Sequence, residues 1–214
     1  MLAWVYEAAA RCEELDGVVV ATDAEEIAAL CRERGWMFRL TSPELASGSD
    51  RVDAVAREIA AEIYVNIQGD EPQLEPEHIS TLLRPFRHPH VEASTLRVAC
   101  SPANVHNPNA VKVVSALDGR ALYFSRAPIP FHRDGEMGSA PRYWKHIGLY
   151  AYRREALHRF TRLPPSELER AERLEQLRFL ENGIAIHVET TETDTVGVDT
   201  EEDLQVVDAL LRKR

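Results

Sequence analysis

The sequence predicts an α/β fold in which helices flank a mostly parallel, mixed β-sheet. Short apolar runs such as 17–22 and 63–67 alternate with stretches whose apolar residues recur at helical spacing. The three consecutive valines at 18–20 are typical of a parallel strand that is buried on both faces. The middle of the chain departs from this alternation, because Asp118-Gly119 separates two β-rich runs and predicts a hairpin.

The first part of the chain is expected to alternate helices and strands. An amphipathic helix opens it, because Leu2, Val5, Tyr6 and Ala9 share one helical face. Gly35 is a plausible stop for the second helix, and Pro76 suits the first position of the fourth. The strands expected here cover 17–22, 37–40 and 63–67, and the helices cover 24–34, the stretch around Val52 to Ile59, and a segment beginning at 76.

The later part is expected to be a hairpin region followed by a return to α/β. Residues 111–152 contain the hairpin and a further strand, and form either a dimerisation arm or an extension of the sheet. Thr200 to Asp203 matches a capping box and opens the last helix. The other elements expected here are strands at 93–100, 111–114, 120–124, 146–152 and 184–188, and one helix at 166–182.

Composition narrows the class of protein. With 214 residues and 44% hydrophobic content, the chain can build one substantial core, so we expect one domain over 1–214. The net charge of −10 argues against a broad nucleic-acid-binding surface. No stretch reaches the ~18 apolar residues of a membrane span. Three widely spaced cysteines match no zinc or redox pattern and indicate buried thiols in a reducing, cytoplasmic compartment.

The most informative stretch is the run from Val65 to Pro72, where an apolar strand ends at a carboxylate. Gly69 allows a sharp turn and Pro72 prevents the strand from continuing. Ligands of open α/β sheets bind beyond the carboxyl ends of the strands, so Asp70 could face a cation or a phosphate there. A plain surface turn is the alternative, because Gly, Asp and Pro are common in turns.

A second carboxylate, Asp199, follows the short run Val196-Gly197-Val198 and precedes a helix. Mg²⁺ is usually held by one or two carboxylates together with substrate phosphate oxygens, so Asp70 and Asp199 could form such a site. The alternative for Asp199 is stabilisation of the helix N-terminus. His88-Pro89-His90 looks like a metal-binding pair but lacks further ligands, and we expect it to be a loop.

Several motifs in order along the chain resemble one family, the 3-deoxy-manno-octulosonate (KDO) cytidylyltransferases. The motifs are Gln68-Gly69-Asp70-Glu71-Pro72, Asn107-Pro108-Asn109-Ala110-Val111-Lys112-Val113-Val114, Ala121-Leu122-Tyr123-Phe124-Ser125-Arg126, Lys145-His146-Ile147-Gly148-Leu149-Tyr150-Ala151-Tyr152-Arg153, Leu174-Glu175-Gln176-Leu177-Arg178 and Gly197-Val198-Asp199-Thr200. The resemblance implies a single domain with a nucleotide-diphospho-sugar transferase-like fold. It also implies attack of the KDO anomeric hydroxyl on the α-phosphate of CTP, which gives CMP-KDO and pyrophosphate for lipopolysaccharide biosynthesis.

The resemblance also implies roles for individual residues. Asp70 and Asp199 would be the catalytic carboxylates that hold Mg²⁺. The loop Ser47-Gly48-Ser49-Asp50-Arg51 matches a cytidine-site motif, although Ser49 replaces a threonine and Leu45 stands where the family often has histidine. Residues implied in binding are Ser47, Gly48, Ser49, Arg51 and Gln68 for the nucleotide and Arg126, His146, Tyr150, Glu175 and Gln176, together with Gln68, for the sugar.

Structural roles remain the alternatives for several of these residues. Ser49 and Asp50 could cap a helix. His146 and Tyr150 alternate with apolar residues on a strand and could be core groups, and Glu175 and Gln176 could be solvated on a helix. Arg126 suits the KDO carboxylate because a guanidinium can donate two parallel hydrogen bonds.

The functional alternatives are a CMP synthetase for another acidic sugar, sialic-acid-like or amino-substituted, and a non-catalytic nucleotide-binding or dimerising relative. The resemblance suggests a homodimer that uses residues 111–152. Members of the family begin with a strand and an Arg- and Lys-bearing phosphate loop that this sequence does not contain. We therefore expect the chain as given to be weakly active or inactive.

Overall fold

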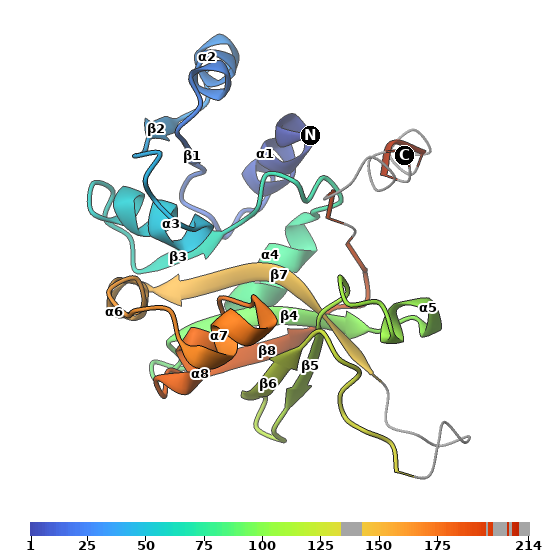
Figure 1. Cartoon of the computed structure of the whole chain (residues 1–214). Helices are drawn as coiled ribbons and strands as arrows, with labels where there is room; N and C mark the ends of the chain where they lie inside the picture. The colour runs from blue at the N-terminus through green and yellow to red at the C-terminus, as the bar shows by residue number, and fades with distance from the viewer. Residues whose placement is uncertain (134–142, 196, 199–204, 206, 210–214) are drawn as a thin grey trace. The chain divides into compact units, whose positions relative to one another are not determined.

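The computed structural model describes residues 1–133, 143–195, 197–198, 205 and 207–209. These residues form two compact units. The first comprises Met1–Ser80, Tyr152–Thr161 and the described residues from Thr195 onward, and the second comprises Thr81–Ala151 and Arg162–Asp194. Figure 1 shows the elements of both units.

The first unit contains a small parallel sheet and several helices. Its elements are α1 (Leu2–Ala10), β1 (Val20–Thr22), α2 (Glu25–Arg34), β2 (Phe38–Leu40), α3 (Gly48–Ala56), β3 (Ile63–Asn66), the start of α4 (Pro76–Leu83) and α6 (Arg154–Phe160). Strand β1 pairs with β2 in parallel, with Val20 opposite Phe38. The predicted stops and starts are confirmed, because Gly35 ends α2 at φ 67° and α4 begins at Pro76.

The strand predicted at 17–22 is shorter and less buried than expected. It begins at Val20, and Val18, Val19 and Val20 are all half-buried. Among the described strands, β1 belongs to a two-stranded sheet with β2 as its one neighbour. A strand with a single partner lacks the cover that both faces of a central parallel strand receive, which explains the exposure of the valines.

The second unit is built on a mixed sheet, as predicted. Strand order is β6-β5-β7-β4-β8, and β7 also pairs with β3. Strands β4 (Ala93–Ala99) and β8 (Ile186–Thr190) are parallel, whereas β5 (Lys112–Ser115) is antiparallel to β6 (Ala121–Ser125) and to β7 (Trp144–Arg153). The short helical elements here are η1 (Arg84–Arg87), α5 (Pro102–Val105), α7 (Glu167–Glu172) and α8 (Leu177–Glu181).

The core of the second unit includes residues from both faces of its strands, because β4 has four consecutive buried residues. Leu96, Val113, Phe124 and Leu149 are buried, and each lies on a different strand. Val113 lies opposite Phe124 in the register of β5 and β6, so these two side chains share one face of the sheet. The predicted hairpin is confirmed, with Gly119 at φ 86° in its turn.

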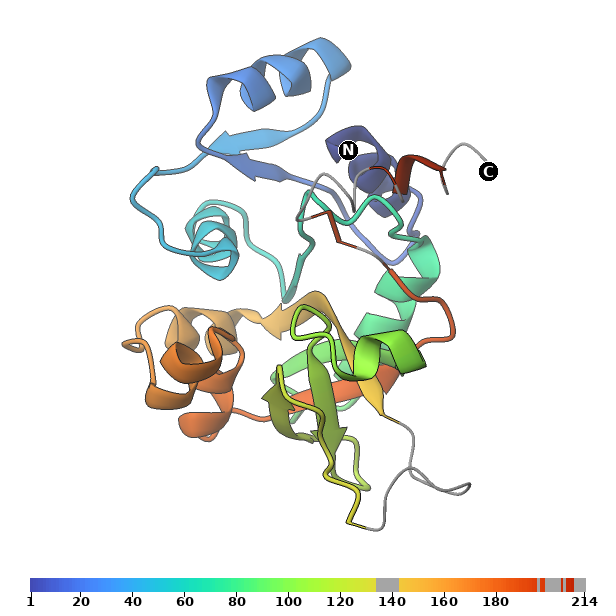
Figure 2. The same ribbon diagram turned by 45° about the vertical axis from the view of Figure 1, so that its right-hand side comes forward.

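The helix predicted at 166–182 is not continuous, and this prediction was wrong. Arg173 adopts a left-handed conformation at φ 53°, so α7 ends before it and α8 begins at Leu177. Figure 2 shows them as separate short orange helices. The break buries Leu174 and brings Arg178 Nε to 2.8 Å from Glu169 Oε2. Tertiary burial thus outweighs the cost of a left-handed residue, which is modest for a single position.

None of the helices that the structure describes is long and apolar enough to cross a membrane. The predicted capping box at 200–203, which would open the last helix, lies outside the described residues.

Candidate active site

The turn after β3 carries Asp70 to the point where a distant segment of the same unit returns. The turn is closed by a hydrogen bond of 3.4 Å from Glu71 N to Gln68 O, and Asp70 is half-buried. Val198 N donates to the carbonyl oxygen of Asp70 at 3.0 Å. A β-carbon at Gly197 would lie 3.3 Å from Glu71 Oε1, so this contact is close.

Asp199, the second predicted carboxylate, lies outside the described residues. The joint role of Asp70 and Asp199 therefore stays a prediction.

The predicted nucleotide loop forms the N-terminus of α3. Ser47 is the N-cap, and its hydroxyl oxygen accepts a hydrogen bond from Asp50 N at 3.2 Å. Ser47 Oγ also lies 2.9 Å from Asp50 Oδ2, to which it donates. The capping role that we considered for Ser49 and Asp50 thus belongs to Ser47, which provides a partner for the backbone amide of Asp50.

Gly48 lies against the end of β3. A β-carbon at this position would be 2.9 Å from Gln68 Nε2 and 3.6 Å from Asn66 Nδ2. The absence of a side chain at position 48 therefore allows the start of α3 to approach Gln68. The structure thus brings together two predicted site residues that are 20 positions apart in the sequence.

Arg51 and Ser49 are held by the same unit. The Arg51 guanidinium lies 3.1 Å from Asp23 Oδ2 and donates to Thr41 Oγ1 at 2.7 Å. Ser49 is buried, with its hydroxyl 3.5 Å from the Tyr152 hydroxyl. Arg51 is therefore a brace between the loop and the end of β1, and Ser49 faces the interior.

Arg126, the predicted carboxylate ligand, is anchored by backbone carbonyls. Its guanidinium donates to Glu172 O at 2.8 Å, Pro108 O at 2.9 Å and Arg173 O at 3.4 Å. These bonds use Nε and one N–H of each terminal nitrogen, and a guanidinium has five N–H groups. Two N–H groups remain for a ligand, one on each terminal nitrogen.

Two further residues of this cluster were missed by the sequence analysis. Lys112 is fully buried and donates from Nζ to Asn107 O at 2.9 Å and to Ala110 O at 2.6 Å. Glu172 accepts from Ser125 Oγ at 2.5 Å and from Arg126 N at 3.0 Å. A lysine within the apolar run 111–114 was a usable signal for Lys112, whereas nothing local marks Glu172.

Burial also perturbs Lys112, because desolvation holds the pKa of its ammonium below the usual value. Nearby Arg126 lowers that pKa as well. Lys112 and Arg126 thus both donate to backbone carbonyl oxygens of the loop 107–110.

His146 is a buried, neutral imidazole. Burial, with a smaller contribution from the Lys145 charge, lowers its pKa to about 3. Its Nε2 lies 2.9 Å from Thr95 Oγ1, which in turn lies 2.8 Å from Leu149 O. A carbonyl can only accept, so the single hydroxyl proton of Thr95 goes to Leu149 O and Nε2 carries the proton of the imidazole. Nδ1 is then the acceptor.

The remaining sugar-side candidates also belong to the second unit. Tyr150 lies beside His146, with ring centroids 5.4 Å apart. Glu175 and Gln176 lie in the turn between α7 and α8, not on the helix that we predicted, and Gln176 is buried. The positions of Glu175 and Gln176 depend on the break at Arg173.

The structure therefore groups the predicted residues into two sets. The nucleotide and metal candidates that it describes, Ser47, Gly48, Ser49, Arg51, Gln68 and Asp70, lie in the first unit. The sugar candidates, Arg126, His146, Tyr150, Glu175 and Gln176, lie in the second.

Comparison with known proteins identifies the family. A cytidylyltransferase family model matches residues 1–189. The 3-deoxy-manno-octulosonate cytidylyltransferase of Acidobacterium capsulatum is 58% identical over 100% of this chain and 86% of its own length. The enzyme of the same name from Koribacter versatilis is 53% identical over 100% of this chain and 81% of its own length. The chain belongs to the 3-deoxy-manno-octulosonate cytidylyltransferase family.

A solved structure gives the same assignment. The CMP:2-keto-3-deoxy-manno-octonic acid synthetase complexed with CTP matches with a TM-score of 0.93 and 40% identity, over 99% of this chain and 87% of that one. The predicted family is thereby confirmed. A putative glucose-1-phosphate thymidylyltransferase from Bacillus anthracis shares the fold at a TM-score of 0.63 and 16% identity, which supports the predicted fold class alone.

Proposed function

We propose that this cytidylyltransferase-family chain transfers CMP from CTP to KDO and releases pyrophosphate, for lipopolysaccharide biosynthesis. The observation that carries the proposal is the 58% identity, over the full chain, with a relative named for this activity. That relationship favours KDO over another acidic sugar. The anomeric oxygen of KDO would bond to the α-phosphorus while the bond to the bridging oxygen of pyrophosphate breaks, and the hydroxyl proton would pass to solvent or to the released pyrophosphate.

The loop at the start of α3 would bind the nucleotide. Helix N-termini attract anions and polar groups because their first amides have no partner within the helix. Gly48 permits close approach of the backbone, and the neighbouring Gln68 side chain offers both a donor and an acceptor. Arg51 would keep the loop in place through its ion pair with Asp23.

The sugar would be bound by the second set of residues. The two remaining N–H groups of Arg126 suit the KDO carboxylate. His146 Nδ1 would accept a hydrogen bond from a sugar hydroxyl, and the neutral state of the ring keeps that role constant over physiological pH. Tyr150, Glu175 and Gln176 supply further hydroxyl, carboxylate and amide groups.

We also propose Mg²⁺ as the cofactor, held by Asp70 and Asp199. Among the described residues, no three His, Cys, Asp or Glu side chains are grouped to hold an ion by themselves. Mg²⁺ does not require such a group, because one or two carboxylates with phosphate oxygens and water complete its shell. The half-buried carboxylate of Asp70 fits this chemistry. When bound, the ion would neutralise charge on the phosphates.

A cytoplasmic homodimer is the proposed form of the protein. Leu122 is 61% exposed on β6, and Phe131 is 86% exposed shortly after that strand. Strand β6 ends the described strand order of the second unit, and exposed edge strands with apolar residues favour pairing. The cysteines Cys12, Cys31 and Cys100 are free thiols, which suits a reducing compartment.

A pyrophosphate-release assay tests the activity. The chain is incubated with CTP, Mg²⁺ and either KDO, a sialic acid or an amino-substituted KDO. We expect any pyrophosphate release to depend on KDO. Release with another sugar and not with KDO would contradict the substrate assignment, and a thermal shift with CTP without release would favour a binding protein.

The dimer is tested separately by sedimentation. Leu122→Glu should give a monomer, whereas Leu168→Glu, at an exposed leucine on α7, should leave the dimer intact. A monomeric parent chain would refute the homodimer.

A further inference from the structure

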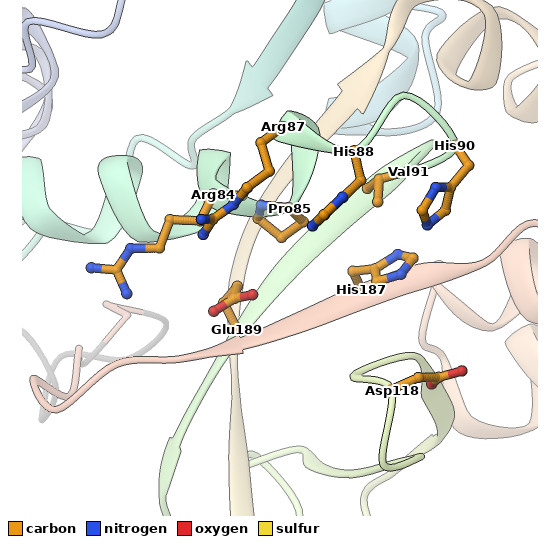
Figure 3. A pocket seen from close by; sticks show the side chains of 9 residues that line it. All are labelled: Arg84, Pro85, Arg87, His88, His90, Val91, Asp118, His187 and Glu189. Atoms are coloured by element: carbon orange, nitrogen blue, oxygen red, sulfur yellow. The ribbon is translucent and has the colours of Figure 1, made fainter.

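A polar pocket of about 300 Å³ lies in the second unit and uses none of the residues proposed for catalysis. Figure 3 shows the side chains that line it. They are Arg84, Pro85, Arg87, His88, His90, Val91, Asp118, His187 and Glu189.

Three parts of the chain form this pocket. The 3-10 helix η1 buries Pro85 and Phe86, so that Arg84 and Arg87 remain exposed on its other side. The loop 88–90 follows η1, as predicted from the sequence. Strand β8 contributes His187, and the hairpin turn lies against it through a hydrogen bond of 2.8 Å from Val188 N to Gly119 O.

The charges around the pocket leave two cations unpaired. Asp118 forms an ion pair with Arg120, whose Nε lies 2.8 Å from Asp118 Oδ2. Glu189 interacts electrostatically with Arg97. Arg87 Nε donates to Arg84 O at 2.9 Å. Within the part of the chain that the structure describes, neither Arg84 nor Arg87 forms an ion pair with a carboxylate. Their guanidinium groups are therefore available to an external anion.

Three imidazoles lie together at the same pocket (Figure 3). The ring centroids of His88 and His90 are 5.7 Å apart, and those of His90 and His187 are 6.2 Å apart. His187 Nδ1 is buried and has no hydrogen-bond partner among the described residues. A buried polar atom without a partner costs stability, and a rotation of the His187 ring that turns this atom toward the pocket would let a ligand recover that cost.

A metal ion explains this cluster less well than an anion does. In the described ranges no group of three His, Cys, Asp or Glu side chains is placed to hold a metal. Two histidines bound to one tetrahedral ion would have ring centroids roughly 5 Å apart, given metal–nitrogen bonds near 2.0 Å. Both centroid distances exceed that value, and two arginines at the same pocket oppose a cation.

We propose that this pocket is a second binding site, for a small oxyanion such as inorganic phosphate, pyrophosphate or the phosphoryl group of a small molecule. Arg84 and Arg87 supply the charge-assisted hydrogen bonds that suit tetrahedral oxyanions. His88, His90 and His187 supply further N–H donors. The exposed arginine side chains can reorient toward the ligand, because rotamers of exposed residues change within nanoseconds.

His187 makes the site sensitive to pH. Burial, followed by the neighbouring His90, lowers the pKa of His187 from its usual value. The other charged groups that face His187 are His88, Asp118 and Arg120, with Glu189 on its own strand. A bound anion favours the protonated imidazole and raises the pKa of His187, so binding should strengthen as pH falls.

The test follows the ring protons of His187 by NMR while sulfate, phosphate or pyrophosphate is added without Mg²⁺. Sulfate stays a dianion between pH 6 and 8, so its use separates titration of the protein from titration of the ligand. We expect saturable shifts, a raised His187 pKa and tighter sulfate binding at pH 6 than at pH 8. Arg84→Gln with Arg87→Gln should weaken binding by roughly tenfold or more.

A control pair with the same charge change, Arg11→Gln with Arg162→Gln, should leave the shifts unchanged. Equal weakening in both pairs would show that net charge alone is responsible, and would overturn the proposal. Absence of saturation at His187 would overturn it as well. Asp70→Asn should not affect this site, so failure here is distinguishable from failure of the proposed active site.

Discussion

The backbone amide of Val198 donates a hydrogen bond of 3.0 Å to the carbonyl oxygen of Asp70. This bond joins the turn after β3 to a segment near the end of the chain. Gly197 lies against Glu71 in the same place, since a β-carbon at 197 would be 3.3 Å from Glu71 Oε1 and the Glu71 side chain would have to shift slightly. The contact places the residue before Asp199 at the first proposed metal ligand, which makes a joint role of both aspartates testable.

Replacing Asp70 by Asn should remove Mg²⁺-dependent binding and activity. The amide keeps the shape of the side chain but loses the negative charge that a hard cation requires. Any KDO-dependent pyrophosphate release by the parent chain should fall by up to roughly a thousand-fold, since charge stabilisation by a metal contributes several kcal/mol. The Mg²⁺-dependent thermal shift with CTP should disappear. Asp16→Asn, at an exposed aspartate, is the control, and an unchanged shift in Asp70→Asn would refute the assignment.

The sequence predicted those elements that have a local cause. Gly35 ends α2 because a left-handed residue is needed there, Pro76 begins α4, and Asp118-Gly119 makes the hairpin turn. The break at Arg173 has no such local signal. It follows from burial of Leu174, which depends on packing that a helical pattern alone does not contain.

In the candidate site, too, some features have a local signal in the sequence and others depend on contacts between distant residues. Asp70 could be selected from the turn that follows its strand, and the family resemblance supplied the roles of Arg126 and His146. The resemblance could not supply their contacts. Arg126 is anchored through Glu172, which lies 46 positions away, and the protonation of His146 depends on Thr95 on another strand. Such contacts between distant residues arise only in the folded chain.

Gly48→Ala should weaken CTP binding more than it alters stability. The new β-carbon would lie 2.9 Å from Gln68 Nε2, so the Gln68 side chain must move away from the start of α3. We expect the affinity for CTP to fall roughly tenfold, which is about 1.4 kcal/mol. Alanine favours a helix over glycine by up to about 1 kcal/mol. This gain opposes the cost of displacing Gln68, so the free energy of unfolding should change little. Calorimetric titration and urea unfolding measure the two effects.

Two further variants interpret the Gly48→Ala result. Gly17→Ala is the matched control, because a β-carbon there meets nothing within 4 Å. Gly48→Ala combined with Gln68→Ala removes the collision and reports the contribution of Gln68 itself. If Gly48→Ala binds CTP as the parent chain does, close approach at position 48 has no role in nucleotide binding.

Asp53→Asn should destabilise the first unit. Asp53 is buried and contacts His158 Nδ1, and Arg57 Nη2 lies 2.8 Å from its Oδ2. Burial raises the pKa of Asp53, but hydrogen bonds from His158 and Arg57 outweigh this effect and hold that pKa below the usual value. Removing the charge leaves His158 with a poorer partner, so the free energy of unfolding should fall by about 2–4 kcal/mol at pH 7.

The Asp53 effect should depend on pH in a defined direction. A carboxyl whose folded pKa is lowered stabilises the fold above its unfolded pKa and loses this effect as pH falls through the folded pKa. The difference between the parent and Asp53→Asn should therefore shrink in acid. Arg57→Ala should cost less than about 1 kcal/mol, because Arg57 is 64% exposed. The stabilities are measured by urea unfolding. If Asp53→Asn is as stable as the parent chain at pH 7, the contacts of Asp53 with His158 and Arg57 do not stabilise the first unit.

His146 should make the fold less stable in weak acid. Its pKa is about 3 in the folded chain, against 6.5 for an unperturbed histidine. The unfolded state therefore binds the extra proton first, and stability falls as pH decreases from 6.5 toward 3. Between pH 7 and pH 5 this single group should cost about 2 kcal/mol. Urea unfolding of His146→Gln should lack this part of the pH dependence, whereas exposed His106→Gln should retain it.

NMR of the same ring separates this cause from a general effect of acid. The His146 ring should stay neutral down to pH 5, with the proton on Nε2, because the Thr95 hydroxyl proton goes to Leu149 O. Thr95→Val removes the acceptor of that N–H, so the preference for the Nε2 tautomer should weaken while the ring stays buried. A His146 ring that titrates near pH 6.5 would contradict both the burial and the proposed role of Nδ1 as a constant acceptor for the sugar.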